Sequence, residues 1–407
     1  MSEIKETLSF KEVKRNEKLN YAEVFLISPF IVVIQQFVPM LATQLGASPI
    51  LLGWVTSGSA LMLAITAMMS NWYRSRAPEG IRALVMPFVI FRSMLIWIPL
   101  VLLLPAYRAE VLILLTIISN FFAGLGQITF VTLLPRYTWR NRLSSLVSFR
   151  WTALGIGMSI SLAGLGFVLN AFPMPVNYFV MCGIALVITI ISSLCLVSIR
   201  PAPPSAGSSH SATSRPNIKE ILAHKPAAYF LLVTLLTQIA LNAAVPLITL
   251  RLVREMGLSD FEFGITNSVL WAGIAIASVA IPTLVRKFGT RVVFAASGIG
   301  LAAQVFLLIT ASSAQATWIA SFIGGIASVM FQVTQFSLIV DSAPPESLDN
   351  FISVQGMALN IGIFIGPLLM SGLVNVGMSV AIGLAICGVA RISSTALILA
   401  QPQKGER

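Results

Sequence analysis

Long apolar stretches separate short clusters of charge along this chain, and this alternation predicts its elements. Four stretches contain no Asp, Glu, Lys or Arg: 24–73, 151–199, 292–340 and 350–390. Each can hold two membrane-spanning helices of about 20 residues joined by an uncharged turn. Shorter stretches that hold one helix each are 83–107, which is interrupted by Arg92, 111–135, 226–250 and 263–285. The pattern therefore predicts an all-α polytopic membrane protein with about twelve transmembrane helices.

The distribution of basic residues predicts the orientation of these helices. Five of them precede the first span, namely Lys5, Lys11, Lys14, Arg15 and Lys18, and the others recur mainly after every second span. By the positive-inside rule both termini are cytoplasmic. We expect a multi-pass protein of the cytoplasmic membrane, without a removable signal peptide.

A polar segment rich in Pro, Ser and Ala at 200–220 indicates a connector between two halves. Three residue pairs in corresponding loops, Arg82 with Arg291, Pro135 with Pro344 and Asn141 with Asn350, are each 209 positions apart, as expected for a duplication. The predicted parts are a cytoplasmic N-terminal segment (1–20), a first six-helix half (21–199), a cytoplasmic linker (200–225), a second six-helix half (226–400) and a cytoplasmic tail (401–407). The two halves are predicted to be pseudo-symmetric.

Composition narrows the class of function. The chain is 57% hydrophobic and only 10% charged, which excludes a soluble domain of this length. Its net charge of +11 follows from membrane topology, so we expect no nucleic-acid partner. The three cysteines form no CxxC pair, both histidines lie in or beside the linker, and no nucleophile, base and acid cluster together on facing helices. We therefore expect no enzyme, no catalytic residue and no cofactor or metal site.

The loop PTLVRKFGTR, 282–291, resembles the short loop motif of the major facilitator superfamily, which runs Gly, any, Leu, small, Asp, Arg, any, Gly, basic, basic. Leu284, Lys287, Gly289 and Arg291 match the motif, whereas Pro282, Arg286 and Thr290 depart from it. Segments 341–367 and 133–150 resemble the family's loops into spans 11 and 5. The resemblance implies a 6+6 fold that alternates access around a cavity lined mainly by spans 1, 4, 7 and 10.

All four of those spans carry side-chain amides near mid-depth. An amide in hydrocarbon without a partner is costly, so these residues should face the protein interior. They either form hydrogen bonds between helices or line a cavity, and their joint placement on the four expected helices favours substrate contact. The predicted cavity residues are Gln35, Gln36, Gln127, Gln238, Asn242, Gln332 and Gln335.

Charged residues at membrane depth are expensive and often functional. Arg92 either binds an anionic group or pairs with Glu23, and Arg391 reaches the cytoplasmic surface along its own helix. Glu23 and Arg150 could form a salt bridge that closes the cavity from inside, and Glu23 is the candidate acid if the coupling ion is H⁺. Loop 286–291 is either a topology anchor or a hinge. The predicted gating or coupling residues are Glu23, Arg92, Arg150, Arg286, Gly289, Arg291 and Asp341.

These features predict a secondary transporter, a monomer in the lipid bilayer, that moves a small organic solute. Amides and aromatic residues without an acid at mid-depth suit a neutral or amphipathic ligand, and export of amphipathic compounds is slightly favoured. Uptake of a neutral solute such as a sugar is the alternative within this class. The alternative from another class is a non-transporting assembly factor or sensor with the same fold.

Overall fold

Helices make up the secondary structure of the computed structural model, which describes residues 8–76, 82–139, 142–202, 218–278, 280–344 and 348–402. No strand occurs within these ranges. Eleven helical segments there are long and apolar enough to cross a membrane. The predicted all-helical polytopic class is confirmed, while the count of twelve spans and the cytoplasmic location of the termini stay predictions.

The helices follow the predicted apolar stretches. In the first part of the chain they are α1 (Phe10–Leu26), α2 (Ser28–Val32), the π-helical turn η1 (Val33–Phe37), α3 (Val38–Gln44), α4 (Pro49–Arg76), α5 (Arg82–Arg92), α6 (Met94–Val101), α7 (Arg108–Leu133), η2 (Leu134–Arg136), α8 (Leu143–Ala171) and α9 (Val176–Val197). In the second part they are α10 (Ile218–Ala223), α11 (Lys225–Leu250), the π-helical turn η4 (Arg251–Glu255), α12 (Asp260–Ser278), α13 (Ile281–Phe288), α14 (Thr290–Thr310), α15 (Ala314–Ser342), α16 (Leu348–Asn375), α17 (Val380–Ala396) and η5 (Leu397–Ala400).

Helix ends coincide with local capping signals. Ser9 and Glu12 form a capping box at the start of α1, in which each side chain bonds the other residue's backbone N–H. Ser259 and Glu262 form the same reciprocal pair before α12. Gly289 ends α13 and begins α14 with φ +82° and ψ 153°, a conformation open only to glycine without strain. The junction between α13 and α14 therefore depends on the conformational freedom of this glycine.

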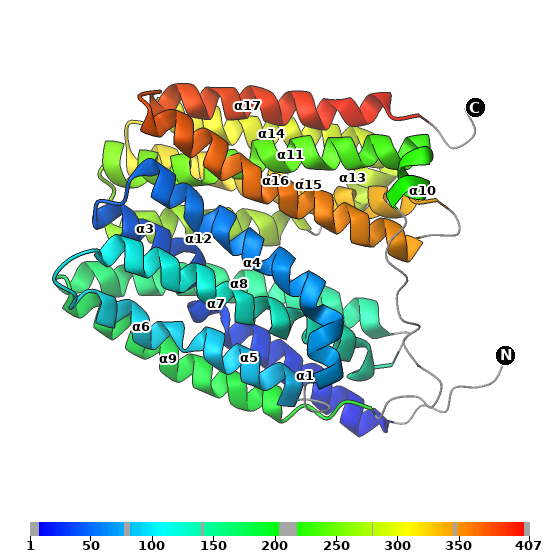
Figure 1. Ribbon diagram of the computed structural model, residues 1–407, viewed down its shortest axis with the longest axis horizontal. Coiled ribbons are helices and arrows are strands. Elements are labelled where there is room, and N and C mark those ends of the chain that lie inside the picture. The colour runs from blue at the N-terminus through cyan, green and yellow to red at the C-terminus, as the bar shows by residue number, and fades with distance from the viewer. Residues whose placement is uncertain are drawn as a thin grey trace. The chain divides into compact units, whose positions relative to one another are not determined.

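The chain divides into two compact units, which Figure 1 shows as ribbons. The N-terminal unit contains Met1–Val38 and Met62–Ser209, and the C-terminal unit contains Pro39–Leu61 and His210–Arg407. By this division α3 and the first part of α4 belong to the C-terminal unit. The domain boundaries predicted from the sequence stay a prediction.

In the N-terminal unit, α1 packs against α8 and α9. Its buried residues recur every three or four positions at Val13, Asn16, Asn20 and Val24, so one face of the helix meets its neighbours. Two of these are amides, and the Asn16 side chain donates to the backbone carbonyl of Tyr137. Polar hydrogen bonds therefore fix the beginning of α1 within the unit.

In the C-terminal unit, α11 packs against α16 and α17, and α15 packs against α12 and α14. Glycines allow the closest approaches: a Cβ on Gly366 of α16 would lie 2.5 Å from the Ile239 carbonyl oxygen, and one on Gly325 of α15 would overlap that of Leu270. The sequence contains small residues in series on span 11, and close helix packing explains them.

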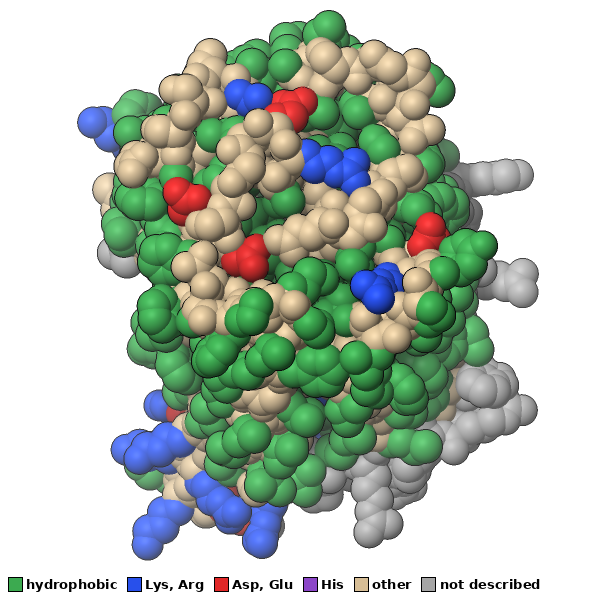
Figure 2. Space-filling view, turned by 90° about the vertical axis from the view of Figure 1, so that its left-hand side faces the viewer, with side chains coloured by type: hydrophobic (Ala, Val, Ile, Leu, Met, Phe, Trp, Pro, Cys, Tyr) green, Lys and Arg blue, Asp and Glu red, His purple; other side chains and the backbone are tan. Residues whose placement is uncertain are grey.

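Apolar side chains are widely exposed on the outer helix faces. Ile160, Phe167, Leu194 and Ile276 each have 60% or more of their surface exposed. Such helix faces fit hydrocarbon rather than water as their surroundings. The view in Figure 2 faces the left-hand side of Figure 1; its upper part shows acidic and basic side chains among tan groups, hydrophobic side chains predominate below them, and basic side chains gather at the lower left margin.

Candidate functional site

A cavity of about 450 Å³ lies within the C-terminal unit. Six helices contribute to its wall: α11, α12, α14, α15, α16 and α17. Its lining is mostly apolar, and the polar contributions are amides, one serine and one arginine. The volume is in the range of pockets that hold a small organic molecule.

Four predicted cavity residues line this pocket together: Gln238 and Asn242 from α11, and Gln332 and Gln335 from α15. The Asn242 side-chain amide donates to both oxygens of Gln238, at 2.9 Å to the backbone and 3.0 Å to Oε1. The Gln335 Nε2 atom is buried and has no hydrogen-bond partner. The protein therefore leaves a donor of Gln335 unsatisfied, whereas Asn242 is partly satisfied within its own helix.

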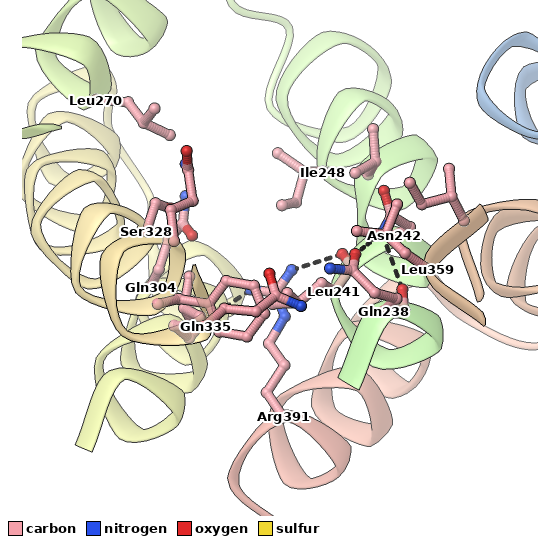
Figure 3. A pocket seen from close by; sticks show the side chains of 15 residues that line it. Gln238, Leu241, Asn242, Ile248, Leu270, Gln304, Ser328, Gln335, Leu359 and Arg391 are labelled. Atoms are coloured by element: carbon pink, nitrogen blue, oxygen red, sulfur yellow. Dashed lines mark hydrogen bonds between the residues drawn. The ribbon is translucent and has the colours of Figure 1, made fainter. Parts of the chain in front are cut away.

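Sequence reasoning did not place two further polar residues, Gln304 and Arg391, in the pocket (Figure 3). Gln304 is 6% exposed and occupies space left by Gly324, where an added Cβ would overlap the Gln304 Cδ. A glutamine within an otherwise apolar span, opposite a span with two consecutive glycines, is the signal that could have identified it.

Arg391 corrects an expectation. Its side chain does not reach the surface along its helix, since the residue is 4% exposed and the side chain extends from α17 into the pocket (Figure 3). Nη1 donates to the Leu301 carbonyl at 2.8 Å and Nη2 to the Leu241 carbonyl at 3.0 Å. Hydrogen bonds to two neighbouring helices hold the guanidinium inward, which the single sequence could not show.

The other three predicted cavity residues lie in the N-terminal unit and are not part of this pocket's lining. Gln35 and Gln36 are on η1, the first exposed and the second half-buried. Such π-helical turns within longer helices are frequent at functional sites. Gln127 is exposed on α7. That these three amides contact a solute stays a prediction.

Glu23 joins two arginines in the interior of the N-terminal unit. Arg92 Nη2 lies 3.0 Å from Glu23 Oε1, and Arg150 Nη1 lies 3.4 Å from Oε2. Arg92 also donates to Ser193 Oγ at 2.6 Å, and Arg150 donates to Asn20 Oδ1 at 2.7 Å. Both pairings of Glu23 considered from the sequence are present. They connect α1 with α5 and α8 inside one unit, and a gating role for them stays a proposal.

A second carboxylate near the start of α1 escaped sequence reasoning. Glu17 accepts both hydrogen bonds of a bidentate pair with Arg142, at 2.7 and 2.8 Å, and a third from Thr138 at 2.7 Å. The bonds to Glu17 raise the pKa of the Arg142 guanidinium, which lies in the loop before α8. The segment up to residue 20 was assigned to a free cytoplasmic part, so its contacts were not expected.

The basic residues of the predicted loop 286–291 lie in the last turn of α13 and the first turn of α14. Arg286 is exposed and donates to Thr283 Oγ1 at 3.3 Å, while Arg291 Nη1 donates to the Gln401 carbonyl at 2.9 Å. Asp341 is exposed near the end of α15. Arg291 therefore ties the start of α14 to the end of η5, and the hinge role of the loop stays a prediction.

Polar contacts also connect α3 with η4 and α12 within the C-terminal unit. Gln44 Nε2 donates to Asp260 Oδ1 at 2.7 Å, and Arg254 donates to the Thr43 and Ala47 carbonyls. Asp260 precedes the predicted span 263–285. Burial raises the pKa of its carboxyl, and the bond from Gln44 acts in the opposite direction.

Known proteins resemble the chain in fold. The crystal structure of a mutant of the nucleoside transporter NupG has a TM-score of 0.74 at 12% sequence identity, covering 96% of this chain and 99% of that one. The D-xylose-proton symporter has a TM-score of 0.73 at 15% identity, with 97% and 99% covered. The partially occluded inward-open xylose transporter XylE from E. coli has a TM-score of 0.70 at 15% identity, with 98% and 99% covered.

No curated protein sequence matches the chain. The family model of the Major Facilitator Superfamily matches residues 19–367 and also 230–406, which together include nearly the whole sequence. Since this match agrees with the helical architecture and with the fold of the similar structures, the chain is a multi-pass membrane protein that belongs to the Major Facilitator Superfamily.

Proposed function

We propose that this protein is a secondary transporter that moves a small organic solute by alternating access and binds it in the amide-lined pocket of the C-terminal unit. The observation that carries the proposal is the meeting of Gln238, Asn242, Gln332 and Gln335 in one cavity of about 450 Å³. Amides that served only to join helices would have their hydrogen-bonding groups satisfied by protein. The unpaired Nε2 of Gln335 supports a role in binding.

The similar structures support transport of small polar molecules, since they are those of a nucleoside transporter and of xylose transporters. At 12–15% identity they establish the fold alone, so the solute has to be inferred from the residues of this chain. Export of an amphipathic compound remains the direction favoured by the sequence, with uptake of a neutral solute as its competitor.

Flux into proteoliposomes tests the proposal. Purified protein is reconstituted in a known orientation and loaded with one member of a panel of sugars, nucleosides, organic anions or cationic amphiphiles, and exchange of labelled solute is measured. We expect one chemical class to exchange, with the rate reduced in Gln335→Ala. Gln355→Ala is the matched control, because Gln355 also has a buried, unpaired Nε2 but does not line the pocket.

The competing function is a non-transporting assembly factor or sensor that retains the fold. It predicts that solutes either do not bind or bind without crossing the membrane. Ligand binding that raises the melting temperature but produces no exchange in vesicles of either orientation would favour a sensor. Exchange that is equally fast in Gln335→Ala and Gln355→Ala would contradict binding of the solute in this pocket.

A further inference from the structure

Arg391 is a buried cation that lacks a counter-charge. None of the ion pairs found among the described residues includes it. Its two hydrogen bonds go to the neutral backbone carbonyls of Leu301 and Leu241. Carbonyl dipoles orient a guanidinium, but they do not neutralise it, and burial of an unpaired charge is strongly unfavourable. Among the described residues, a group that supplies negative charge is therefore missing from its surroundings.

Two residues that line the cavity each have a buried donor without a hydrogen-bond partner. Arg391 Nε and Gln335 Nε2 are both buried and have no hydrogen-bond partner, and both residues line the pocket. Figure 3 shows both side chains together with those of Gln238 and Asn242, which line the same pocket. A buried N–H without an acceptor is costly, so an acceptor at this position is favoured.

The other residues that line the pocket limit the class of molecule that can carry this acceptor. Arg391 is the only ionisable residue among the described residues that line the pocket, so no carboxylate of its wall competes for it. The remaining wall is largely apolar, with side chains such as Ile248, Leu270 and Leu359, and the amides provide further hydrogen bonds. This arrangement suits a small molecule with an apolar or ring-shaped body and one anionic end.

We propose that the solute carries a carboxylate or phosphate group whose oxygens accept hydrogen bonds from Arg391 Nε and Gln335 Nε2. The proposal rests on the proposed function, because it names the chemical class of the solute for the same pocket. It replaces the neutral or amphipathic ligand expected from the sequence with an organic anion. Guanidinium is well suited to anionic oxygens, because its N–H groups match their planar geometry.

Matched pairs of compounds test this inference, each differing by one anionic group: glucuronate with glucose, benzoate with benzamide, and uridine 5′-phosphate with uridine. Dissociation constants are measured at low ionic strength by thermal-shift titration of the full-length protein in detergent. We expect the anion of at least one pair to bind about tenfold to a hundredfold more tightly than its neutral partner, as charged hydrogen bonds do. The first two pairs probe a carboxylate, and the third probes a phosphate.

Variants test whether the pocket residues cause the preference for the anion over its neutral partner. Arg391→Gln should reduce the ratio of the two dissociation constants to about one, Arg391→Lys should retain part of it, and Gln335→Ala should lower it. Arg251→Gln is the matched control, because Arg251 also donates to backbone carbonyls, those of Leu308, Ile309 and Ala311, but lies outside the pocket. Its ratio should remain that of the unmodified protein. If Arg391→Gln does not fold, the lysine and Gln335 variants decide.

Three outcomes would overturn the inference: equal binding within every pair, a preference for the anion that persists in both Arg391→Lys and Gln335→Ala at full strength, or no binding of any anion. Binding and vesicle exchange of a neutral compound, with loss in Gln335→Ala, would overturn the anionic solute and leave the proposed transport intact. Failure of every compound class to exchange in vesicles would count against the transport proposal instead.

Discussion

Replacement of Glu23 by glutamine should destabilise the N-terminal unit strongly, because it removes the one carboxylate between two arginines. The side chains of Glu23 and Arg92 are 6% and 8% exposed, and that of Arg150 is 15% exposed. Glutamine has nearly the shape of glutamate and keeps one acceptor oxygen, so the change removes charge without leaving a cavity. Arg92 would then be a buried cation whose remaining side-chain hydrogen bond goes to Ser193.

The magnitude follows from the burial of the pair. Removal of one partner of a buried ion pair costs about 3–5 kcal/mol, because the other charge stays in a poorly solvated site. The Arg150 contact is longer, at 3.4 Å against 3.0 Å, and Arg150 has Asn20 as a second acceptor, so most of the loss arises at Arg92. For a unit of this size, 3–5 kcal/mol lowers the melting temperature by roughly 6–20 °C.

Thermal unfolding of the purified protein in detergent measures the effect, and Glu17→Gln is the matched control. Glu17 also pairs with an arginine at the start of α1, but the Arg142 side chain is 38% exposed and can return to water. The Glu17 variant should therefore lose less stability. A loss for Glu23→Gln no greater than that for Glu17→Gln, or an undiminished loss when Arg92→Met is already present, would refute this account of the pair.

Three further changes test other parts of the structure. Gly289→Ala places a side chain at φ +82° and should cost about 1–3 kcal/mol, so an unchanged melting temperature would contradict this backbone conformation. Gly324→Ala places a methyl group against the Gln304 amide and should cost about 1–3 kcal/mol, and the double variant with Gln304→Ala should recover most of it in the same thermal assay. Burial raises the pKa of the Asp260 carboxyl above its ordinary 3.8, so the folded protein binds the carboxyl proton more tightly than the unfolded chain does. The contribution of Asp260 to stability therefore falls as the pH rises from 3.8 through the raised pKa. Asp260→Asn should therefore gain melting temperature relative to the unmodified protein across that range, and a constant difference would show that the carboxyl is not desolvated.

The amides of the C-terminal pocket could be predicted because two independent constraints act on them. Gln238 and Asn242 are four residues apart, and Gln332 and Gln335 are three apart, so each pair shares one helix face. Because an amide without a partner is costly in hydrocarbon, that face should turn away from the lipid. The choice of these two helices as cavity helices came from the family resemblance, and contact of the four amides with a solute stays a prediction.

Arg391 could not be placed in the same way. A long cationic side chain near a helix end can extend along its own helix to the headgroups or across it to a neighbour, and the sequence near position 391 permits both. The inward arrangement depends on the carbonyls of Leu301 and Leu241, which are 90 and 150 residues away in the chain. Such contacts arise only when the helices pack.

The two units also differ in whether a buried arginine has a carboxylate partner, and this difference affects the affinity for a solute. In the N-terminal unit Glu23 compensates the charge of Arg92. In the C-terminal unit the described residues offer Arg391 carbonyl oxygens alone, so the protein itself leaves this cation uncompensated. A neutral solute would leave that cost unchanged, whereas an anion would relieve it only while bound. Relief of the cost of the unpaired cation then adds to the affinity for the anion. The melting temperature should therefore rise more with the anion than with its neutral partner.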